Sequence, residues 1–446
     1  MVRFFSFVMV LLLCAPGYLF AANDKKKTQT HKFDNGDSFT GYIVKGKKEG
    51  EGVYKYKRGS IFKGTFRKNK KVRGTFEYAN GDIYEGSFKN NLFSGPGTLV
   101  YKGRGKYTGN FKNGKEDGKA VFVFNNGDKC NCTFKKGLMK SGTLKLKNGD
   151  TYAGAFKVYL KHGKGVYTFK NGDVFKGEFS KGNRSVGKLV FKNGDKHGGF
   201  YKDGRFGGAG VFTYANGDKF DGHFEEGRFK SGWFYFKTRD KYKGEFKNDK
   251  MHGKGVFHFK NGDRYEGEFA KGYFQGSGTY YFGKKDRYVG EFKQDQMTGK
   301  GVLSLGNGDT YKGEFRDGQL NGKGIYISKA GDQLVGGFSD GNFNGSGEMV
   351  FKDGSRYKGE IKNGMQNGKG VLTFGGGDVY EGLFKNNKMH GAGKYIYHSK
   401  KKNDSVYEGE FVSGLRDGMG LYIKRDGSRL EGIWNKDRFL KTMSLK

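Results

Sequence analysis

Apolar and polar residues alternate in short runs along almost the whole chain. In YKGEF (residues 242–246), the two aromatic rings and the glycine fall on one face of an extended strand, and lysine and glutamate fall on the other. In GVFHF (255–259), aromatic residues again alternate with other residues. No long window places apolar residues three and four apart, so the pattern predicts β-strands throughout.

These two strand signals recur at a fixed short period of 22 or 23 residues, which indicates a repeat array. The period is broken once, where HSKKKND (398–404) adds a small loop, and a half unit, KFDNGD (32–37), precedes the array. Eighteen units begin at Phe39, Phe62, Tyr84, Tyr107, Cys130, Tyr152, Phe175, His197, Phe220, Tyr242, Tyr265, Tyr288, Tyr311, Leu334, Tyr357, Tyr380, Tyr407 and Leu430.

Turn signals separate the strands. Asn-Gly-Asp follows the second strand of many units, and Asn-Gly is the strongest short signal for a two-residue type I′ turn. Each unit is therefore predicted to be a β-hairpin that leads directly into the next one. The triplet begins at positions 35, 80, 126, 148, 171, 193, 216, 261 and 307.

Glycine in the middle of a strand normally weakens it, but it also lets a neighbouring ring lie flat on the backbone. We therefore expect each mid-strand glycine to be matched with an aromatic ring. Because one hairpin cannot bury its own face, each hairpin should lean on its neighbours.

The unit Tyr-x-Gly-x-Phe-x-Asn-Gly-x-x-x-Gly-x-Gly resembles the MORN (membrane occupation and recognition nexus) repeat, and 152–173, 242–263 and 357–378 fit it closely. The resemblance implies an all-β fold, an elongated, twisted, single-layer antiparallel sheet of tandem hairpins with a groove. It also implies binding to acidic lipids or to proteins. The sequence departs from the pattern at Cys132, His197, Leu334 and Leu430.

The chain begins with a signal-peptide pattern. Arg3 precedes the apolar run Phe4–Leu13, and a Pro-Gly break and two small residues follow within residues 1–22. Export is expected (periplasmic, secreted or membrane-associated), with an uncleaved anchor as the alternative; the lysines at 25–27 argue mildly against translocation. The expected organisation is a signal peptide at 1–22, a basic lead-in and half repeat at 23–38, about eighteen repeats at 39–434 and a C-terminal cap at 435–446.

Two cysteines, Cys130 and Cys132, remain beyond residue 22. Alternate residues of a regular strand lie too far apart for a relaxed disulfide. We therefore expect no bridge, and interpret both as small apolar fillers of repeat positions.

No motif for catalysis or cofactor binding stands out from the repeat. His162, His252 and His390 share a position where other units carry Asp117, Asn321, Asn367 or Asp417. A position that accepts His, Asn or Asp favours a short polar side chain that hydrogen-bonds the backbone of the turn. We therefore do not interpret these histidines as metal ligands. The prediction is a non-enzymatic protein with no cofactor and no metal.

The formal net charge is +37, which favours anionic partners. The residue after the strand-ending apolar residue is basic in most units: Arg67, Lys89, Lys112, Lys135, Lys157, Lys202, Lys247, Lys293, Arg316, Lys362 and Lys385. A denser group lies near the N-terminus: Lys45, Lys47, Lys48, Lys55, Lys57, Arg58, Lys63, Arg67, Lys68, Lys70 and Lys71. We interpret both sets as a candidate anionic-surface site. A solvated face that prevents edge-to-edge aggregation is an equally good interpretation.

Three functions follow from these patterns. The leading hypothesis is an exported scaffold that docks on anionic membrane lipid or envelope polymer through many basic contacts. The second is a protein-interaction platform, with self-association as a variant, in which exposed groove aromatics grip a peptide or helix. Nucleic-acid binding ranks last, because export and the absence of a reader module disfavour it. The candidate groove aromatics are Tyr152, Phe156, Tyr242, Phe246, Tyr265, Phe269, Tyr288, Phe292, Tyr311 and Phe315.

Overall fold

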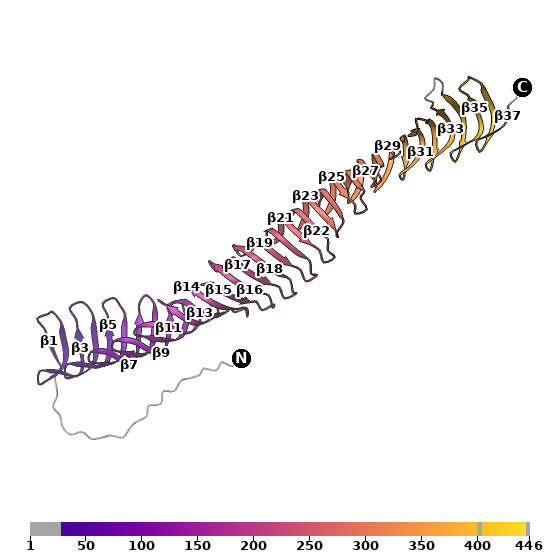
Figure 1. Ribbon diagram of the computed structural model, residues 1–446. Coiled ribbons are helices and arrows are strands. Elements are labelled where there is room, and N and C mark those ends of the chain that lie inside the picture. Colours follow the sequence, from indigo (N-terminus) through magenta and orange to yellow (C-terminus); the bar gives the residue numbers. More distant parts are fainter. Residues whose placement is uncertain (1–27, 399–403, 443–446) are drawn as a thin grey trace, which may run out of the picture. The chain divides into compact units, whose positions relative to one another are not determined.

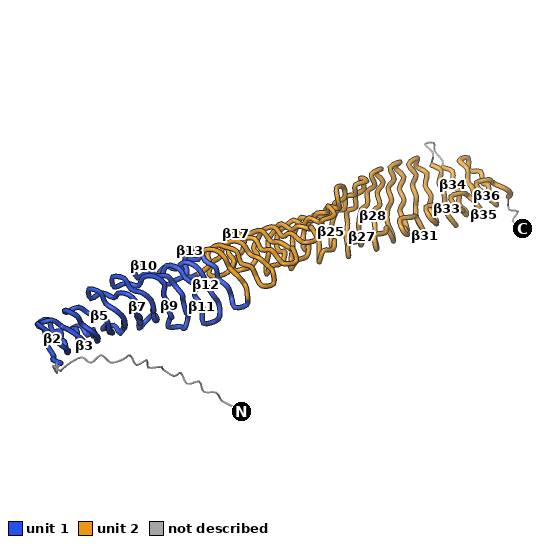
Figure 2. The backbone as a smooth tube through the Cα atoms, turned by 90° about the horizontal axis from the view of Figure 1, so that it is seen from below, with its two compact units in different colours: residues 1–171, 179–182 blue, residues 172–178, 183–446 orange. Residues whose placement is uncertain are grey.

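A computed structural model describes residues 28–398 and 404–442, so the predicted signal segment lies outside the described residues. Every regular element in the described part is a β-strand, and the strands form an open antiparallel sheet of 37 strands (Figure 1). The prediction of an all-β hairpin array is confirmed. The chain divides into two compact units, residues 1–171 with 179–182 and residues 172–178 with 183–446 (Figure 2).

The strands follow one another with short connections. Unit 1 contains β1 Gln29–Lys32, β2 Ser38–Val44, β3 Lys47–Lys55, β4 Ile61–Arg67, β5 Lys70–Glu77, β6 Ile83–Lys89, β7 Leu92–Tyr101, β8 Gly105–Lys112, β9 Lys115–Phe124, β10 Lys129–Lys135, β11 Leu138–Lys145, β12 Thr151–Lys157 and β13 Leu160–Thr168. The next strand, β14 Val174–Ser180, contributes to both units. Unit 2 contains β15 Asn183–Val190, β16 Lys196–Lys202, β17 Arg205–Thr213, β18 Lys219–Glu225, β19 Arg228–Tyr235, β20 Lys241–Lys247, β21 Lys250–His258, β22 Arg264–Ala270, β23 Tyr273–Phe282, β24 Asp286–Lys293, β25 Gln296–Ser304, β26 Thr310–Arg316, β27 Gln319–Ile327, β28 Gln333–Ser339, β29 Asn342–Val350, β30 Arg356–Lys362, β31 Met365–Thr373, β32 Val379–Lys385, β33 Lys388–Tyr397, β34 Ser405–Val412, β35 Leu415–Ile423, β36 Arg429–Asn435 and β37 Arg438–Thr442.

One face of the sheet, here called the ring face, carries the leading aromatic residues of the repeats. Within β26 and β27, Gly313 pairs with Gly324, and the Tyr311 ring covers both glycines. A Cβ on Gly313 would lie 2.6 Å from Tyr311 Cζ and 2.7 Å from Gly324 Cα. The expected match of ring and glycine is therefore confirmed, and the Tyr311 hydroxyl donates to the Glu314 carbonyl at 3.0 Å.

The ring face forms a largely aromatic hydrophobic core, which in unit 2 includes one cluster of buried residues from Phe220 to Trp434. The Tyr242 ring packs edge to face on Phe246 of its own hairpin, with centroids 5.2 Å apart, and on Phe269 of the next hairpin, at 4.8 Å. Tyr265 repeats this geometry with Phe269 and Phe292, at 5.2 and 4.8 Å. Each leading ring is thus held by two closing rings, which couples neighbouring hairpins.

The prediction that these rings line an exposed groove is wrong, because they are buried against one another. All ten candidate groove aromatics have at most 7% of their surface exposed: Tyr152, Phe156, Tyr242, Phe246, Tyr265, Phe269, Tyr288, Phe292, Tyr311 and Phe315. They form the hydrophobic core that a single-layer sheet would otherwise lack.

The two turns of each repeat differ from the prediction. The type I′ turn, which needs positive φ at both central residues, joins the two strands of a hairpin; Asn248 and Asp249 have φ of 53° and 59°. The Asn-Gly-Asp turn is of another kind, because in 261–263 only Gly262 has a positive φ, at 96°. There the Asn261 side chain accepts the Asp263 N–H at 3.0 Å, and the Gly262 N–H donates to the Phe259 carbonyl at 3.1 Å.

The aspartate of each Asn-Gly-Asp turn connects successive repeats. Asp309 Oδ1 accepts the N–H of Lys329 in the next turn at 2.8 Å, while its Oδ2 accepts the Tyr326 hydroxyl. Asp263 binds the N–H of Gly283 and the hydroxyl of Tyr280 in the same way, at 2.7 and 3.0 Å. These carboxylates satisfy turn N–H groups that would otherwise lack a protein partner.

The cysteines also differ from the prediction, because Cys130 and Cys132 form a disulfide. Their Cα atoms are 5.4 Å apart, within the usual range for a bridge. Cys130 occupies the leading-ring position and Cys132 the glycine position of their repeat, and both are buried. The bridge therefore fills the space where other repeats seat a ring on glycine.

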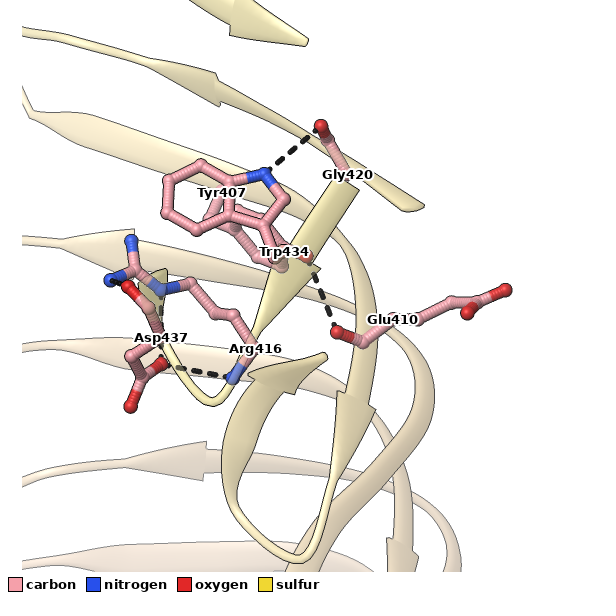
Figure 3. Close-up of polar contacts among 6 residues, drawn as sticks. All are labelled: Tyr407, Glu410, Arg416, Gly420, Trp434 and Asp437. Carbon is pink, nitrogen blue, oxygen red and sulfur yellow. Dashed lines mark hydrogen bonds and ion pairs between the residues drawn. The ribbon is translucent and has the colours of Figure 1, made fainter. Parts of the chain in front are cut away.

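The last hairpin, β36 and β37, extends the sheet instead of folding over its edge. Trp434 takes the closing-ring position and packs on Tyr407 at 5.3 Å, while its indole N–H donates to the Gly420 carbonyl at 3.3 Å (Figure 3). The Arg416 guanidinium lies 4.3 Å from the Trp434 ring centroid and bonds Asp437 Oδ1 at 3.1 Å.

Substituting Gly313 with alanine tests the seating of ring on glycine. We expect Gly313→Ala to lower the free energy of unfolding by about 1–3 kcal/mol, because the added methyl must displace the Tyr311 ring or the backbone. Gly198→Ala is the matched control, since a Cβ on Gly198 would meet no atom within 4 Å. Urea unfolding followed by circular dichroism makes the comparison; equal midpoints for the two variants would contradict the packing.

The aspartate connections predict a loss of local stability in acid. The Tyr326 hydroxyl and the Lys329 N–H hold the pKa of Asp309 below its usual value. The stability that the ionised Asp309 carboxylate contributes is therefore complete above pH ~4 and is lost as the pH falls through the lowered pKa. Deuterium exchange of the turn at Lys329 should be faster in Asp309→Asn than in the parent at pH 7. The difference in exchange rate between Asp309→Asn and the parent should be smaller at pH 3. A difference that does not change with pH would show that ionisation of Asp309 does not stabilise the turn.

Candidate functional site

The strand-end cations lie where the sequence pattern placed them. Each is the last residue of the first strand of its hairpin, as Lys89 is in β6 and Lys247 is in β20. All eleven are exposed: Arg67, Lys89, Lys112, Lys135, Lys157, Lys202, Lys247, Lys293, Arg316, Lys362 and Lys385. Within each unit they recur beside the type I′ turns, so they form a row of positive charge at one end of the strands.

The N-terminal basic group is also mostly exposed, over β2 to β5. Lys45, Lys47, Lys55, Lys57 and Arg58 are all exposed, and the structure gives them no ion pair with a residue in the described ranges. Lys63 pairs with Glu77 at 2.9 Å, and its side chain is 54% exposed. This part of the surface therefore presents several positive charges that no carboxylate neutralises.

Two members of this group, Lys48 and Lys71, do not belong to the exposed surface. Lys71 Nζ lies within 6.0 Å of four ring centroids, and the nearest, Tyr56 and Phe76, are each at 5.4 Å. Burial lowers the pKa of the Lys71 amine, and the positive charge of Lys48 lowers it further. These lysines are therefore poorly placed to contact an anionic surface.

Comparison with other repeats explains the difference. In some later hairpins the same position carries a ring that stacks on the leading ring, as Phe93 does on Tyr84 at 3.7 Å and Phe274 does on Tyr265 at 3.9 Å. In the first two hairpins a lysine fills this place on the ring face and makes cation–π contacts.

Four glutamates, Glu245, Glu268, Glu314 and Glu360, recur between the mid-strand glycine and the strand-ending apolar residue of their units. In the described ranges, no ion pair joins a lysine to Glu245, Glu268, Glu314 or Glu360. Instead, the carboxylate of each lies against the first glycine of the following strand, as Glu360 does at Gly368, whose φ is 76°. Glu360 Oε1 accepts the Lys369 N–H at 3.2 Å.

The opposite face, here called the open face, carries the residues between the rings and is hollowed in places. In unit 2, Val289, Val302, Ile325 and Val335 form the apolar floor of a groove of about 860 Å³. Lysines line it at Lys300, Lys312 and Lys323, together with the carboxylate of Glu314. A smaller hollow of about 490 Å³ follows over β30 to β33.

Unit 1 has a more polar hollow on the same face. It measures about 720 Å³ and lies over β5 to β8, with Thr75, Thr98 and Thr108 among its lining residues. Sequence reasoning missed these hollows because it placed the groove on the aromatic side. The available signal was the run of valine and isoleucine at the positions between ring and glycine.

The shared histidine position fits its structural interpretation. At the equivalent places Asp117 accepts the Lys136 N–H at 3.1 Å and Asn367 accepts the Asn386 N–H at 3.3 Å. Within residues 28–398 and 404–442, no group of three His, Cys, Asp or Glu side chains is arranged to hold a metal ion. In the same ranges no helix has the length and hydropathy needed to cross a membrane.

The chain belongs to the MORN repeat family. The family model matches fourteen segments that together cover well over half of the chain: residues 39–61, 62–83, 84–105, 107–129, 152–174, 199–219, 242–264, 265–287, 288–310, 311–333, 335–356, 357–379, 380–400 and 407–429. The repeats beginning at Cys130, Phe175, Phe220 and Leu430 are outside these segments, yet they form hairpins of the same kind.

Other comparisons add little. No curated protein sequence matches the chain significantly. Among solved structures, the TCP domain of Drosophila melanogaster SAS-4 in complex with a proline-rich motif of Ana2 is 14% identical, with a TM-score of 0.21, and the match covers 47% of this chain and 99% of that one. A catalytically inactive virginiamycin B lyase from Staphylococcus aureus is 10% identical, with a TM-score of 0.11, and the match covers 69% and 93%. Scores this low support no inference about function.

Proposed function

We propose that the protein is an exported, non-catalytic scaffold that docks on anionic membrane lipid or envelope polymer through many basic contacts. The observation that carries the proposal is the exposed positive charge: the row of strand-end cations together with the N-terminal group over β2 to β5.

Multivalency makes such a surface effective without a pocket. Each lysine or arginine near an acidic bilayer contributes about 1 kcal/mol, so a few cations acting together produce firm binding. Lys47, Lys55, Lys57 and Arg58 suit this role best, because all four are exposed and unpaired within the described residues. The interaction should weaken steeply with salt, since exposed charges are screened.

Sedimentation with liposomes tests the proposal. The mature chain should sediment with acidic vesicles and not with neutral ones, and binding should fall across a salt series. Replacing Lys47, Lys55, Lys57 and Arg58 with glutamine should weaken binding at least tenfold, as expected for the loss of several contacts of about 1 kcal/mol each.

The matched control removes four exposed lysines from the Asn-Gly-Asp turns or their equivalents in unit 2, Lys237, Lys260, Lys329 and Lys352. This variant has the same net charge and should bind more tightly than the first. Equal losses would show that net charge alone matters, and the absence of any preference for acidic vesicles would refute lipid docking.

The open-face groove of unit 2 favours a second candidate function, a platform for an amphipathic helix or extended peptide. An apolar floor of Val289, Val302, Ile325 and Val335 beside three lysines suits a ligand with one apolar side and acidic flanks. This groove lies on the face opposite the rings, so the aromatic residues first suggested for the role do not contribute to it.

Peptides selected by phage display against the full chain provide the probe for this groove. We expect Val302→Asp with Ile325→Asp to abolish binding of groove ligands, because charges would replace the apolar floor. Val121→Asp, at the equivalent position of a hairpin outside the groove, should leave it intact. Isothermal titration makes the comparison, and peptides that bind all variants equally would contradict a groove site.

A further inference from the structure

The open face of β18 to β24 carries one transverse row in which cations and rings alternate. Successive members are paired in register on consecutive strands, so their side chains share one face of the sheet. The row comprises Lys219, Tyr235, Lys241, His258, Arg264, Tyr281 and Arg287. A fourth aromatic residue, Trp233, lies beside it on β19, with its ring within 26° of parallel to both Tyr235 and His258.

The alternation of cations and rings is confined to three consecutive hairpins. The other hairpins with register partners in this row carry no ring at the position of Tyr235, His258 and Tyr281. These residues are Lys55, Glu77, Val100, Val123, Lys145 and Thr168 in unit 1, and Val190, Thr213, Ser304, Ile327, Val350, Thr373, Ile396 and Ile423 in unit 2. The repeat fold therefore does not need an aromatic residue here, whereas it needs the buried rings of the ring face.

The row has aromatic surface and positive charge available to a ligand. Tyr235, His258 and Tyr281 are half-buried, because no second layer covers the open face. Lys219 and Arg264 pack on Tyr235 and Tyr281, at 5.3 and 4.2 Å from the ring centroids. Each also pairs with a carboxylate of its own strand, Lys219 with Asp221 at 3.0 Å and Arg264 with Glu266 at 3.7 Å.

Two other cations of the row are not engaged in this way. Lys241 and Arg287 are exposed, and neither makes an ion pair with another residue in the described ranges. They offer charge that an anionic ligand can neutralise.

The spacing of the row limits the ligand. Members two strands apart are separated by about 9.6 Å, twice the distance between neighbouring strands. Successive rings of the row are separated by this distance, and so are successive cations, each of which lies on a strand between two ring-bearing strands or at an end of the row. This step is close to the length of one disaccharide in an extended polysaccharide, and it exceeds the repeat of a nucleotide backbone. A bilayer surface offers no rings for the aromatic residues to stack on.

We propose that this row, with Trp233, binds an acidic polysaccharide that carries one carboxylate per disaccharide. Sugar rings stack on Tyr235, His258 and Tyr281, and carboxylates of the ligand lie at Lys241 and Arg287, the two exposed cations of the row that make no ion pair within the described residues. The site is separate from the basic surfaces proposed for lipid docking, so either function can fail without the other.

Hyaluronan oligosaccharides, which have one carboxylate per disaccharide, are a suitable probe for the mature full chain. Trp233 lies in the site, so binding should change tryptophan fluorescence, whereas neutral dextran should not bind. The combined variant Tyr235→Thr, His258→Thr and Tyr281→Thr should weaken binding at least about tenfold, given the energy of stacking on aromatic side chains. Threonine already occupies this position at Thr373, so the fold should tolerate it.

A charge variant and its control complete the test. Lys241→Gln with Arg287→Gln should also weaken binding, whereas Lys106→Gln with Lys129→Gln, at the equivalent position of hairpins without these rings, should not. Circular dichroism and the thermal midpoint show that each variant is folded. Unchanged affinity in the threonine variant would overturn the proposal, as would tighter binding of oligo(dT) or acidic vesicles at this row in matched salt.

Discussion

The structure depends on one contact, an aromatic ring laid flat on two glycines that face each other across neighbouring strands. A single-layer sheet has no second layer to bury its apolar face, so the rings must supply the core themselves. They can do so only where the backbone beneath them carries no side chain or, as at Ala120 opposite Gly109 under Tyr107, no more than a methyl group. Gly313 and Gly324 under Tyr311 show the geometry, and edge-to-face contacts with the closing rings on both sides extend it from hairpin to hairpin.

This constraint gives the two faces of the sheet different roles. The ring face is filled by its own side chains and has little freedom to change. The exception is the second residue of each hairpin's second strand, which is a ring in some hairpins, as at Phe274, and in others a residue such as Met251, Leu320, Lys71, Arg184, Glu116 or Gln366. The residues of the open face are not needed to fill the core. Its residues vary between repeats, and there the hollows of unit 2 and the row of rings and cations around Tyr235 and Tyr281 occur.

Polar side chains hold the repeats together at the ends of the strands. At one end, aspartates such as Asp309 bind the N–H of the next turn. At the other, side chains such as Asp249 accept an N–H from the preceding hairpin, that of Phe229 at 2.8 Å. Because every turn repeats at the same step, one short polar residue per turn satisfies backbone groups throughout each unit.

Much of this organisation was predictable from local patterns. The alternation of rings with polar residues identifies strands, the fixed period identifies eighteen hairpins, and glycine beside aromatic residues identifies where rings lie on backbone. These features depend on neighbours within one repeat, so a short stretch of sequence contains all the information needed. The resemblance to the MORN repeat rested on the same residues.

Other features were decided only by the tertiary structure. Alternation shows that Tyr242 and Phe246 share a face, but only packing with Phe269 of the next hairpin buries them. The disulfide depends on how far β10 departs from a regular strand, and the burial of Lys71 depends on rings from three hairpins. Likewise, Tyr235, His258 and Tyr281 become one row only when strand pairing brings residues a repeat apart into register. Sequence therefore determined each hairpin and the face of each side chain, while the stacking of hairpins decided which side chains remain exposed.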